Sequence, residues 1–275
     1  MLEPSLLSIN HVTVLQQWSL PELIDGLVRH GVPGISVWRE KLHEVGVDEA
    51  ARRIRDSGLA VSGLCSAGLI TSPSPAEAAA GADDVRRALD EAAALGARCL
   101  VFVAGGIDAR DKDLRGARAR ALDRLADLVP HARAVGVPIG LEPLHPMICA
   151  RRSVLSTVGL ANDWCDALDA GDAVGIVVDT YAVWWDPDLE RQIKRAGRRI
   201  CAFHVNDWLE DTQDLRLDRG MMGDGVIDIP AIRRMVEEAG YAGQREVEVF
   251  SARNWWTRDP DEVIRIVKER YQTAV

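Results

Sequence analysis

Short apolar runs typical of buried β-strands alternate eight times with helix-like stretches along this chain of 275 residues. The runs are rich in Val, Ile and Leu and are bounded by turn residues, as expected for strands that are covered on both faces. The expected strands are Leu6–Ile9, Gly34–Trp38, Leu59–Cys65, Cys99–Ala104, three runs that end at Glu142, Asp179 and His204, and a last run that holds Glu248. This alternation predicts an α/β protein built on a parallel sheet.

Helix start signals precede several of the stretches between these strands. Ser19-Leu-Pro21-Glu22 and Ser74-Pro75-Ala-Glu77 each combine a capping residue, an early proline and a glutamate three positions after the cap. The expected helices cover 19–30, 48–57, 74–96, 115–135, 153–170, 188–196, 228–240 and a last stretch from 259. Eight strand–helix units without a linker predict a single closed (β/α)8 TIM barrel over residues 1–275. The main alternative is an open doubly wound sheet, which would usually carry a glycine-rich phosphate turn that this sequence lacks.

Composition and charge narrow the class of protein. A formal net charge of -9 argues against a general nucleic-acid binder, which would need a basic face. The sequence has no apolar run of about 18 residues, so we expect no membrane contact. The five cysteines are scattered and the chain starts without a basic and apolar leader, which favours a cytoplasmic location. We therefore expect an enzyme that acts on a small molecule, and a homo-oligomer is compatible with the fold.

Four of the expected strands end in, or carry, a residue that can bind a metal ion. These residues are Glu142, Asp179, His204 and Glu248. Active sites of TIM barrels gather at the carboxyl ends of the strands, and a carboxylate buried there needs a partner. Any one such acid is more often a helix cap or a salt-bridge partner, but the four together predict one shared divalent cation. Mn²⁺ is the leading candidate, Mg²⁺ and Co²⁺ suit the same oxygen-rich set, and Zn²⁺ is also compatible.

Aromatic residues are biased toward the same end of the predicted barrel. Indole rings suit the C–H faces of a sugar or polyol, so we expect a carbohydrate or cyclitol substrate. The expected substrate contacts are His11, Trp18, Trp38, His145, Trp184, Trp185 and Trp208. A plain loop residue is an equally good interpretation of His145. The neighbouring pair Arg151-Arg152 is interpreted as solvated charges at a helix end.

Around the four ligand candidates, the sequence resembles the xylose isomerase-like TIM barrels. This family of sugar phosphate isomerases and epimerases includes inosose isomerase, inosose dehydratase and the ketose 3-epimerases. The motifs that carry the likeness are Gly-Leu-Glu142-Pro-Leu-His-Pro, Val-Asp179-Thr-Tyr-Ala-Val-Trp-Trp, Phe-His204-Val-Asn-Asp-Trp and Glu248-Val-Phe-Ser. The resemblance implies that the four residues hold one divalent metal ion. It also implies that Glu142 and Glu248 act as an acid/base pair on opposite faces of the substrate.

One departure from the family leaves the reaction open. The family commonly has a histidine three residues after the metal-binding aspartate, and this chain has Ala182 there. The first hypothesis is an isomerase or epimerase of a ketose or keto-polyol that works through a metal-stabilised enediolate. The second is a metal-dependent dehydratase or lyase on a keto-sugar or keto-inositol, and the third is a sugar-binding barrel without turnover. An abasic-site endonuclease shares the fold but would need a larger ligand set and a basic groove. The exact substrate, and whether it is phosphorylated, are not readable from the sequence.

Overall fold

Eight parallel strands pair in sequence order in the computed structural model, which describes residues 2–275, and β8 returns to pair with β1. The strands are β1 Leu7–Asn10, β2 Gly34–Trp38, β3 Ala60–Gly68, β4 Leu100–Val103, β5 Ile139–Leu141, β6 Val174–Asp179, β7 Ile200–Val205 and β8 Arg245–Val247. The predicted (β/α)8 barrel is thereby confirmed. That residues 1–275 form one domain stays a prediction, and Met1 lies outside the described residues.

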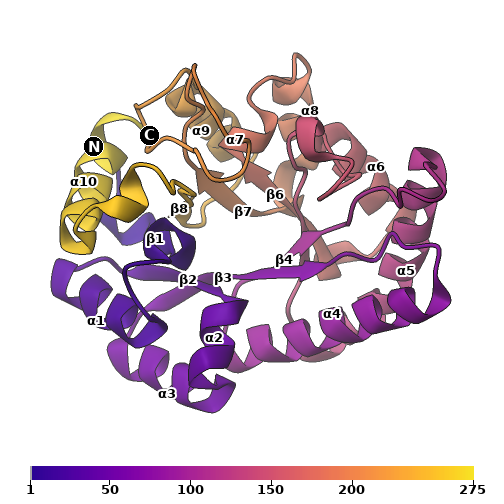
Figure 1. Ribbon diagram of the computed structural model, residues 1–275, viewed down its shortest axis with the longest axis horizontal. Coiled ribbons are helices and arrows are strands. Elements are labelled where there is room, and N and C mark those ends of the chain that lie inside the picture. Colours follow the sequence, from indigo (N-terminus) through magenta and orange to yellow (C-terminus); the bar gives the residue numbers. More distant parts are fainter. Residues whose placement is uncertain (1) are drawn as a thin grey trace.

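Helices cover the outside of the barrel (Figure 1). The long ones are α1 Leu20–His30, α3 Val47–Ser57, α4 Pro75–Leu95, α5 Leu114–Val135, α6 Val158–Leu168, α8 Leu189–Ala196, α9 Ile229–Glu238 and α10 Pro260–Thr273. Both predicted caps are present, because Ser19 accepts a hydrogen bond from the Glu22 backbone and Ser74 from that of Glu77. Two short helices that the sequence did not predict, α2 Arg39–Val45 and α7 Thr180–Val183, directly follow β2 and β6.

The helix expected from residue 153 begins five residues later, at Val158. Residues 153–157 instead run beside the loop that follows β4. The backbone amide of Gly105 donates to the carbonyl of Arg152 at 3.1 Å, and the amide of Val154 donates to the carbonyl of Gly105 at 2.8 Å. Thr157 then caps the helix by accepting from the Leu160 amide at 3.1 Å. Long-range backbone pairing therefore prevails over local helix propensity in this segment.

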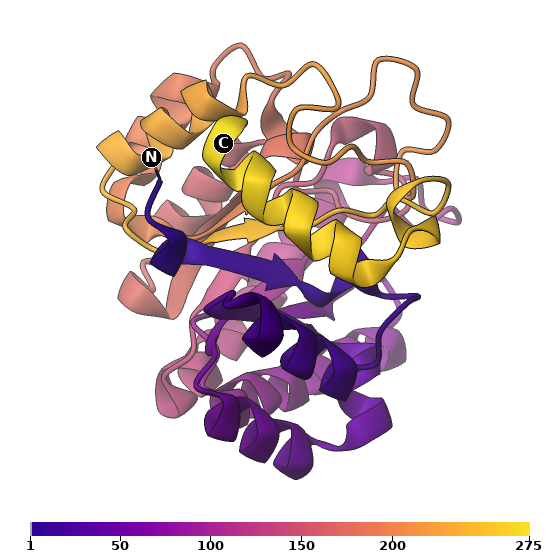
Figure 2. The ribbon, with the colours of Figure 1, turned by 90° about the vertical axis from the view of Figure 1, so that its left-hand side faces the viewer.

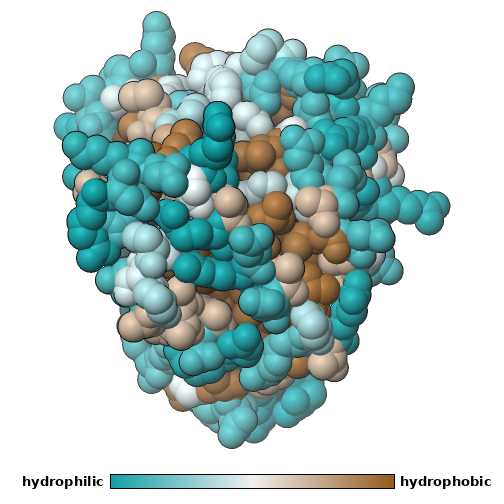
Figure 3. Space-filling view, turned by 90° about the vertical axis from the view of Figure 1, so that its right-hand side faces the viewer, coloured by the Kyte–Doolittle hydropathy of each residue, from teal (hydrophilic) through white to brown (hydrophobic). Residues whose placement is uncertain are grey.

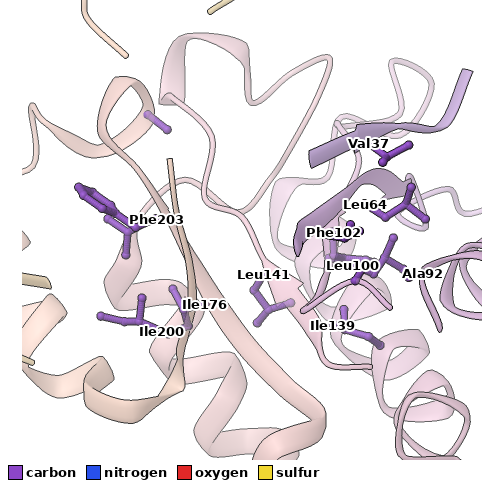
Figure 4. Close-up of a cluster of buried hydrophobic side chains, with 14 of the residues drawn as sticks. Val37, Leu64, Ala92, Leu100, Phe102, Ile139, Leu141, Ile176, Ile200 and Phe203 are labelled. Atoms are coloured by element: carbon purple, nitrogen blue, oxygen red, sulfur yellow. The ribbon is translucent and has the colours of Figure 1, made fainter. Parts of the chain in front are cut away.

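The two faces of the strands pack against different surroundings. Side chains that point outward from the strands, such as Phe102, Leu141 and Ile176, pack beneath the helices (Figure 4). Inward-pointing positions form a separate small cluster that consists of Cys65, Cys99, Val101, Val177 and Ala202. Because side chains alternate along a strand, Asp179 shares the inward face with Val177, and His204 shares it with Ala202. The strand period thus directs the ligand candidates into the barrel.

The two ends of the described chain lie side by side (Figures 1 and 2). The backbone of Leu2 exchanges two hydrogen bonds of 3.0 Å with the side chain of Gln272. The face in Figure 3 is mostly hydrophilic, with smaller hydrophobic areas between the polar side chains. No helix among residues 2–275 combines the length and the hydrophobicity that crossing a membrane requires. The cytoplasmic location and the homo-oligomer stay predictions.

Candidate active site

The ends of four strands bring the predicted ligands Glu142, Asp179, His204 and Glu248 together. Strand register aligns Asp179 with His204, while Glu142 directly follows β5 and Glu248 directly follows β8. All four side chains are buried, and one ligand atom from each lies within 4.8 Å of the others. Ligands of one ion can lie up to twice the bond length apart, which is roughly 4 to 5 Å for divalent cations. The geometry therefore suits one shared cation.

Two buried polar atoms in this cluster support the same interpretation. Glu142 Oε1 and His204 Nδ1 lie 3.2 Å apart, yet neither has a hydrogen-bond partner within residues 2–275. His204 Nδ1 also lies 3.7 Å from Glu248 Oε2. Buried polar atoms are rarely left unpaired, because desolvation without a partner is costly. A cation between these atoms would satisfy them, so the residues present fit a divalent metal ion.

A buried arginine, Arg219, supplies positive charge beside the acids. Its Nη1 atom lies 3.1 Å from Asp179 Oδ2 and 3.1 Å from Glu248 Oε2. Its guanidinium group is sandwiched between the rings of Tyr181 and Phe250, 4.6 Å from each ring centroid. Such stacking fixes the plane of the guanidinium and directs its N–H groups toward the carboxylates.

Backbone hydrogen bonds hold Arg219 in a defined position although it lies in a loop. The amide of Arg219 donates to the carbonyl of Phe250 at 2.8 Å, and Gly220 exchanges two backbone hydrogen bonds of 2.9 Å with Asp207. The side chain of Asp207 also accepts from the amides of Gly223 and Gly225. The long connection between β7 and α9 is therefore tied to the loop after β8, where Glu248 lies.

The acids differ in their proton affinity. Burial raises the pKa of Glu142 to about 7. Burial acts in the same direction on Glu248, but the interactions with His204 and Arg219 outweigh it and lower the pKa of that carboxyl. For Asp179, burial outweighs the charge of Arg219, so its pKa is raised. Arg219 forms a salt bridge with Glu248, whereas the charges of Glu248 and Asp179 raise the pKa of Glu142, and both effects separate the pKa values of the two glutamates. Carboxyl groups whose environments separate their pKa values are typical of acid/base pairs.

A third buried glutamate, Glu246, lies on the Nε2 side of His204. The two residues are aligned across β7 and β8, and Glu246 Oε1 is 3.4 Å from His204 Nε2. Glu246 is held by Asn10 Nδ2 and Ser62 Oγ, each of which donates to it at 2.7 Å. Burial would lower the pKa of His204, but the charge of Glu246 and the carboxylates of Glu142 and Glu248 raise it well above its usual value. Glu246 therefore attracts the Nε2–H edge of the ring and leaves Nδ1 toward the cluster.

We expect Glu246→Gln to weaken the binding of a divalent metal ion. Partners that orient a metal-binding histidine contribute roughly 10- to 100-fold to metal affinity, and the amide would not hold the ring by charge. Competition between the protein and a chelator for Co²⁺ or Zn²⁺ measures the change. Glu238→Gln, at an exposed position of α9, is the matched control and should bind the metal as the wild type does. Equal affinity in the two variants would contradict the role given to Glu246.

A pocket opens above the cluster at the carboxyl ends of the strands. It encloses about 640 Å³, counting the part that is open to solvent, and is lined by residues that include Glu142, Glu248, Arg219, Tyr181 and Phe250. The two glutamates that differ in pKa thus face the same space.

The structure separates the predicted substrate contacts into groups. Trp38 and His145 line the pocket. Trp185 and Trp208 lie against His145, with ring centroids at 5.8 and 4.6 Å, and do not line the pocket themselves. Trp184 lies farther out, 5.9 Å from Trp208. These tryptophans therefore support the wall that holds His145.

The two remaining predicted contacts lie away from the pocket lining. His11 is fully buried, and its Nε2 atom is 3.0 Å from the backbone carbonyl of Trp18. Burial lowers the pKa of His11 to about 4. The Trp18 ring packs so closely on Gly26 that a Cβ atom there would lie 2.5 Å from it. Both residues pack the connection between β1 and α1.

Sequence reasoning missed several residues of the site. Phe250 and Glu246 lie two positions on either side of Glu248, so strand alternation was an available signal for both. Arg219 gave no such signal, because it lies in a long loop. The interpretation of Arg152 as a solvated charge at a helix end was wrong, since this side chain is half-buried, lines the pocket and lies in a turn.

Comparison with known proteins identifies the family. The model of the xylose isomerase-like TIM barrel matches residues 24–270. The crystal structure of protein SMc04130 from Sinorhizobium meliloti 1021 is similar, with 47% sequence identity, coverage of 99% of both chains and a TM-score of 0.96. No curated protein sequence matches the chain.

More distant solved structures share the fold alone. The IOLI protein, whose crystal structure contains a bound zinc atom, has 20% identity, coverage of 98% of this chain and 97% of its own, and a TM-score of 0.85. A D-allulose 3-epimerase from Methylomonas sp. has 22% identity, coverage of 100% of both chains and a TM-score of 0.80. With the family model matching most of its length, the chain belongs to the xylose isomerase-like TIM barrel family.

Proposed function

We propose that this protein is a divalent-metal-dependent isomerase or epimerase of a ketose or keto-polyol. The observation that carries the proposal is the placement of Glu142 and Glu248, with separated pKa values, in one pocket beside Asp179 and His204. The zinc atom of the IOLI structure and the epimerase activity named for the Methylomonas protein support it. Mn²⁺ remains the leading candidate for the cation, with Mg²⁺, Co²⁺ and Zn²⁺ as alternatives.

The proposed reaction moves a proton between two faces of one carbon. One glutamate of the pair removes the proton next to the substrate carbonyl, and the other returns a proton to the opposite face of the resulting enediolate. A divalent cation held by the four ligands would polarise that carbonyl and stabilise negative charge on its oxygen. Arg219 keeps Glu248 and Asp179 in place through its Nη1 contacts, and it lines the pocket. The rings of Tyr181 and Phe250 exclude water from the guanidinium face.

Ala182 favours a second candidate, a dehydratase or lyase. This residue is buried in α7 and lines the pocket at the position where the family commonly has a histidine. Its methyl group leaves space for a different substituent on the substrate. The same enediolate would then expel a leaving group β to the carbonyl instead of regaining a proton. A sugar-binding barrel without turnover is the third candidate.

Solvent exchange in deuterium oxide tests the proposal. Purified protein is stripped with a chelator, reloaded with Mn²⁺ and incubated with D-fructose or 2-keto-myo-inositol, while proton NMR follows the α-proton signal. We expect loss of that signal and formation of an epimer in the Mn²⁺-loaded sample, and neither change in the chelator-treated sample. Enone absorbance would identify elimination instead. Binding of a keto-sugar without any exchange would contradict the proposal and favour a binding protein.

A further inference from the structure

Two arginines at the outer part of the pocket form no salt bridge with any of the residues 2–275. Arg152 and Arg216 line both the pocket above Glu142 and Glu248 and a neighbouring pocket over the ends of β2 and β3. Within residues 2–275, neither guanidinium donates a hydrogen bond or forms a salt bridge, and that of Arg216 lies 5.9 Å from the centroid of the Phe250 ring. The other arginine of the neighbouring pocket, Arg39, is paired with Asp84 at 2.9 Å and with Glu91 at 2.7 Å. The arginines of this region thus fall into a paired and an unpaired group.

Backbone contacts hold both unpaired arginines at the pocket. Arg152 donates from its amide to the Ile148 carbonyl at 2.9 Å and accepts from the Gly105 amide at 3.1 Å. The amide of Arg216 donates to the Asp214 side chain at 2.8 Å, and the next carbonyl, of Leu217, accepts from the Ala252 amide at 2.8 Å. Two different loops therefore present one guanidinium each to the same space. Hydrogen bonds fix the backbone of both arginines, while their guanidinium groups remain free to bind an anion.

The charges around these two side chains favour an anion between them. Burial lowers the pKa of Arg152, and repulsion from the positive charge of Arg216 lowers it further, whereas the charge of Glu142 raises it by less. The nearby acids Asp179 and Glu248 are already paired with Arg219. The chain has a formal net charge of -9, so two neighbouring cations without a salt-bridge partner make this part of the pocket locally positive. Guanidinium groups bind carboxylate and phosphate oxygens through paired N–H groups.

We propose that Arg152 and Arg216 form a subsite for an anionic group of the substrate, a carboxylate or a phosphate. This inference rests on the proposed function, because the subsite shares its pocket with Glu142 and Glu248. The two arginines also reach the neighbouring pocket, whose lining does not include these glutamates. The anionic group is therefore carried at the end of the substrate remote from the reacting carbonyl. The substrate class is a keto-sugar phosphate or a keto-sugar acid.

Three matched ketoses test the subsite by isothermal titration calorimetry on the Mn²⁺-loaded protein. D-fructose, D-fructose 6-phosphate and D-fructuronate carry a hydroxyl, a phosphate or a carboxylate at the same carbon. We expect at least one anionic compound to bind roughly 10- to 100-fold more tightly than D-fructose, as hydrogen bonds to charged groups imply. Whether the phosphate or the carboxylate compound shows the preference identifies the anion.

Matched variants test whether Arg152 and Arg216 cause the preference for the anionic ketoses. Arg152→Gln and Arg216→Gln should each remove most of the preference, which is measured within each variant as the ratio of its affinities for the anionic ketose and for D-fructose. Arg151→Gln is the control, because Arg151 is the exposed neighbour of Arg152 and lines neither pocket. Thermal unfolding of each variant verifies that it is folded. Equal affinity for all three ketoses, no binding of any of them, or a preference that persists in the double variant would overturn the subsite.

The exchange assay on the same samples separates this inference from the proposed function. Exchange of the D-fructose α-proton without any preference for the anionic ketoses would remove the subsite and leave the enolisation in place. A preference that depends on Arg152 and Arg216 without exchange on any ketose would support the subsite and contradict the isomerase or epimerase.

Discussion

Replacement of Glu248 by Gln is expected to abolish exchange of the substrate α-proton with solvent, with a rate loss of roughly 10²- to 10⁴-fold. The amide keeps the size of the side chain and offers an oxygen to a cation, but it does not take up the proton. Glu248 faces the pocket, and His204 and Arg219 hold the pKa of its carboxyl low, so the wild-type group is ionised and able to accept a proton. The rate is measured by proton NMR in deuterium oxide at saturating Mn²⁺.

Glu246→Gln is the matched control for this experiment. Glu246 is a buried glutamate two residues earlier on the same strand face, and it does not line the pocket. At a Mn²⁺ concentration that saturates both variants, Glu246→Gln should retain most of the exchange rate while Glu248→Gln loses it. Undiminished exchange in the metal-loaded Glu248→Gln protein would remove Glu248 from the proton transfer.

Arg219→Met is expected to destabilise the metal-free protein by about 3–5 kcal/mol, the loss typical of removing one partner from a buried ion pair. The change leaves Asp179 and Glu248 buried without the guanidinium that lies 3.1 Å from each of them. The pKa values of both carboxyl groups then rise, because they stay buried and lose the opposing charge of Arg219. A carboxyl group whose pKa is raised in the folded state favours folding at low pH and loses that contribution as pH rises. The deficit of the variant should therefore grow from acidic toward neutral pH.

A divalent cation should restore part of the stability lost in Arg219→Met. The cation and Arg219 neutralise the same two carboxylates, so added Mn²⁺ should raise the melting temperature of the variant more than that of the wild type. Urea unfolding at several pH values, with and without Mn²⁺, measures both effects. Arg216→Met, an exposed arginine of the same loop without a carboxylate partner within residues 2–275, should leave the metal-free stability nearly unchanged. Equal stability of the two variants would show that Arg219 does not compensate the buried acids.

Strand periodicity explains why the clustering of the four ligand candidates was predictable from the sequence. Each ligand ends or directly follows a short apolar run, and alternation along a strand decides whether a side chain points into the barrel or toward the helices. The structure brings Glu142, Asp179, His204 and Glu248 within 4.8 Å of one another, as the sequence predicted. The same rule applied to Glu246 would have placed it on the inward face of β8 as well.

The wall of the pocket was less predictable, because loops build it. Of the tryptophans that were expected to face the substrate, Trp38 lines the pocket, whereas Trp18 packs on Gly26 and the ring centroids of Trp208 and Tyr181 are 4.6 Å apart. A position near a strand end fixes where the backbone of a residue lies, but it does not fix the direction of the side chain. Arg152 was misassigned for a similar reason, since pairing with Gly105 replaced the helix expected there.

The sequence by itself determined the (β/α)8 barrel and the four residues at its mouth, because short-range periodicity encodes strands, helices and the inward face. Tertiary structure alone decided the placement of Arg219, Arg152 and Arg216. Their positions depend on hydrogen bonds between loops far apart in the chain, such as that from Arg219 to Phe250 and that from Gly105 to Arg152. No local pattern specifies such contacts, since they form only after the closed barrel has brought the strand ends together.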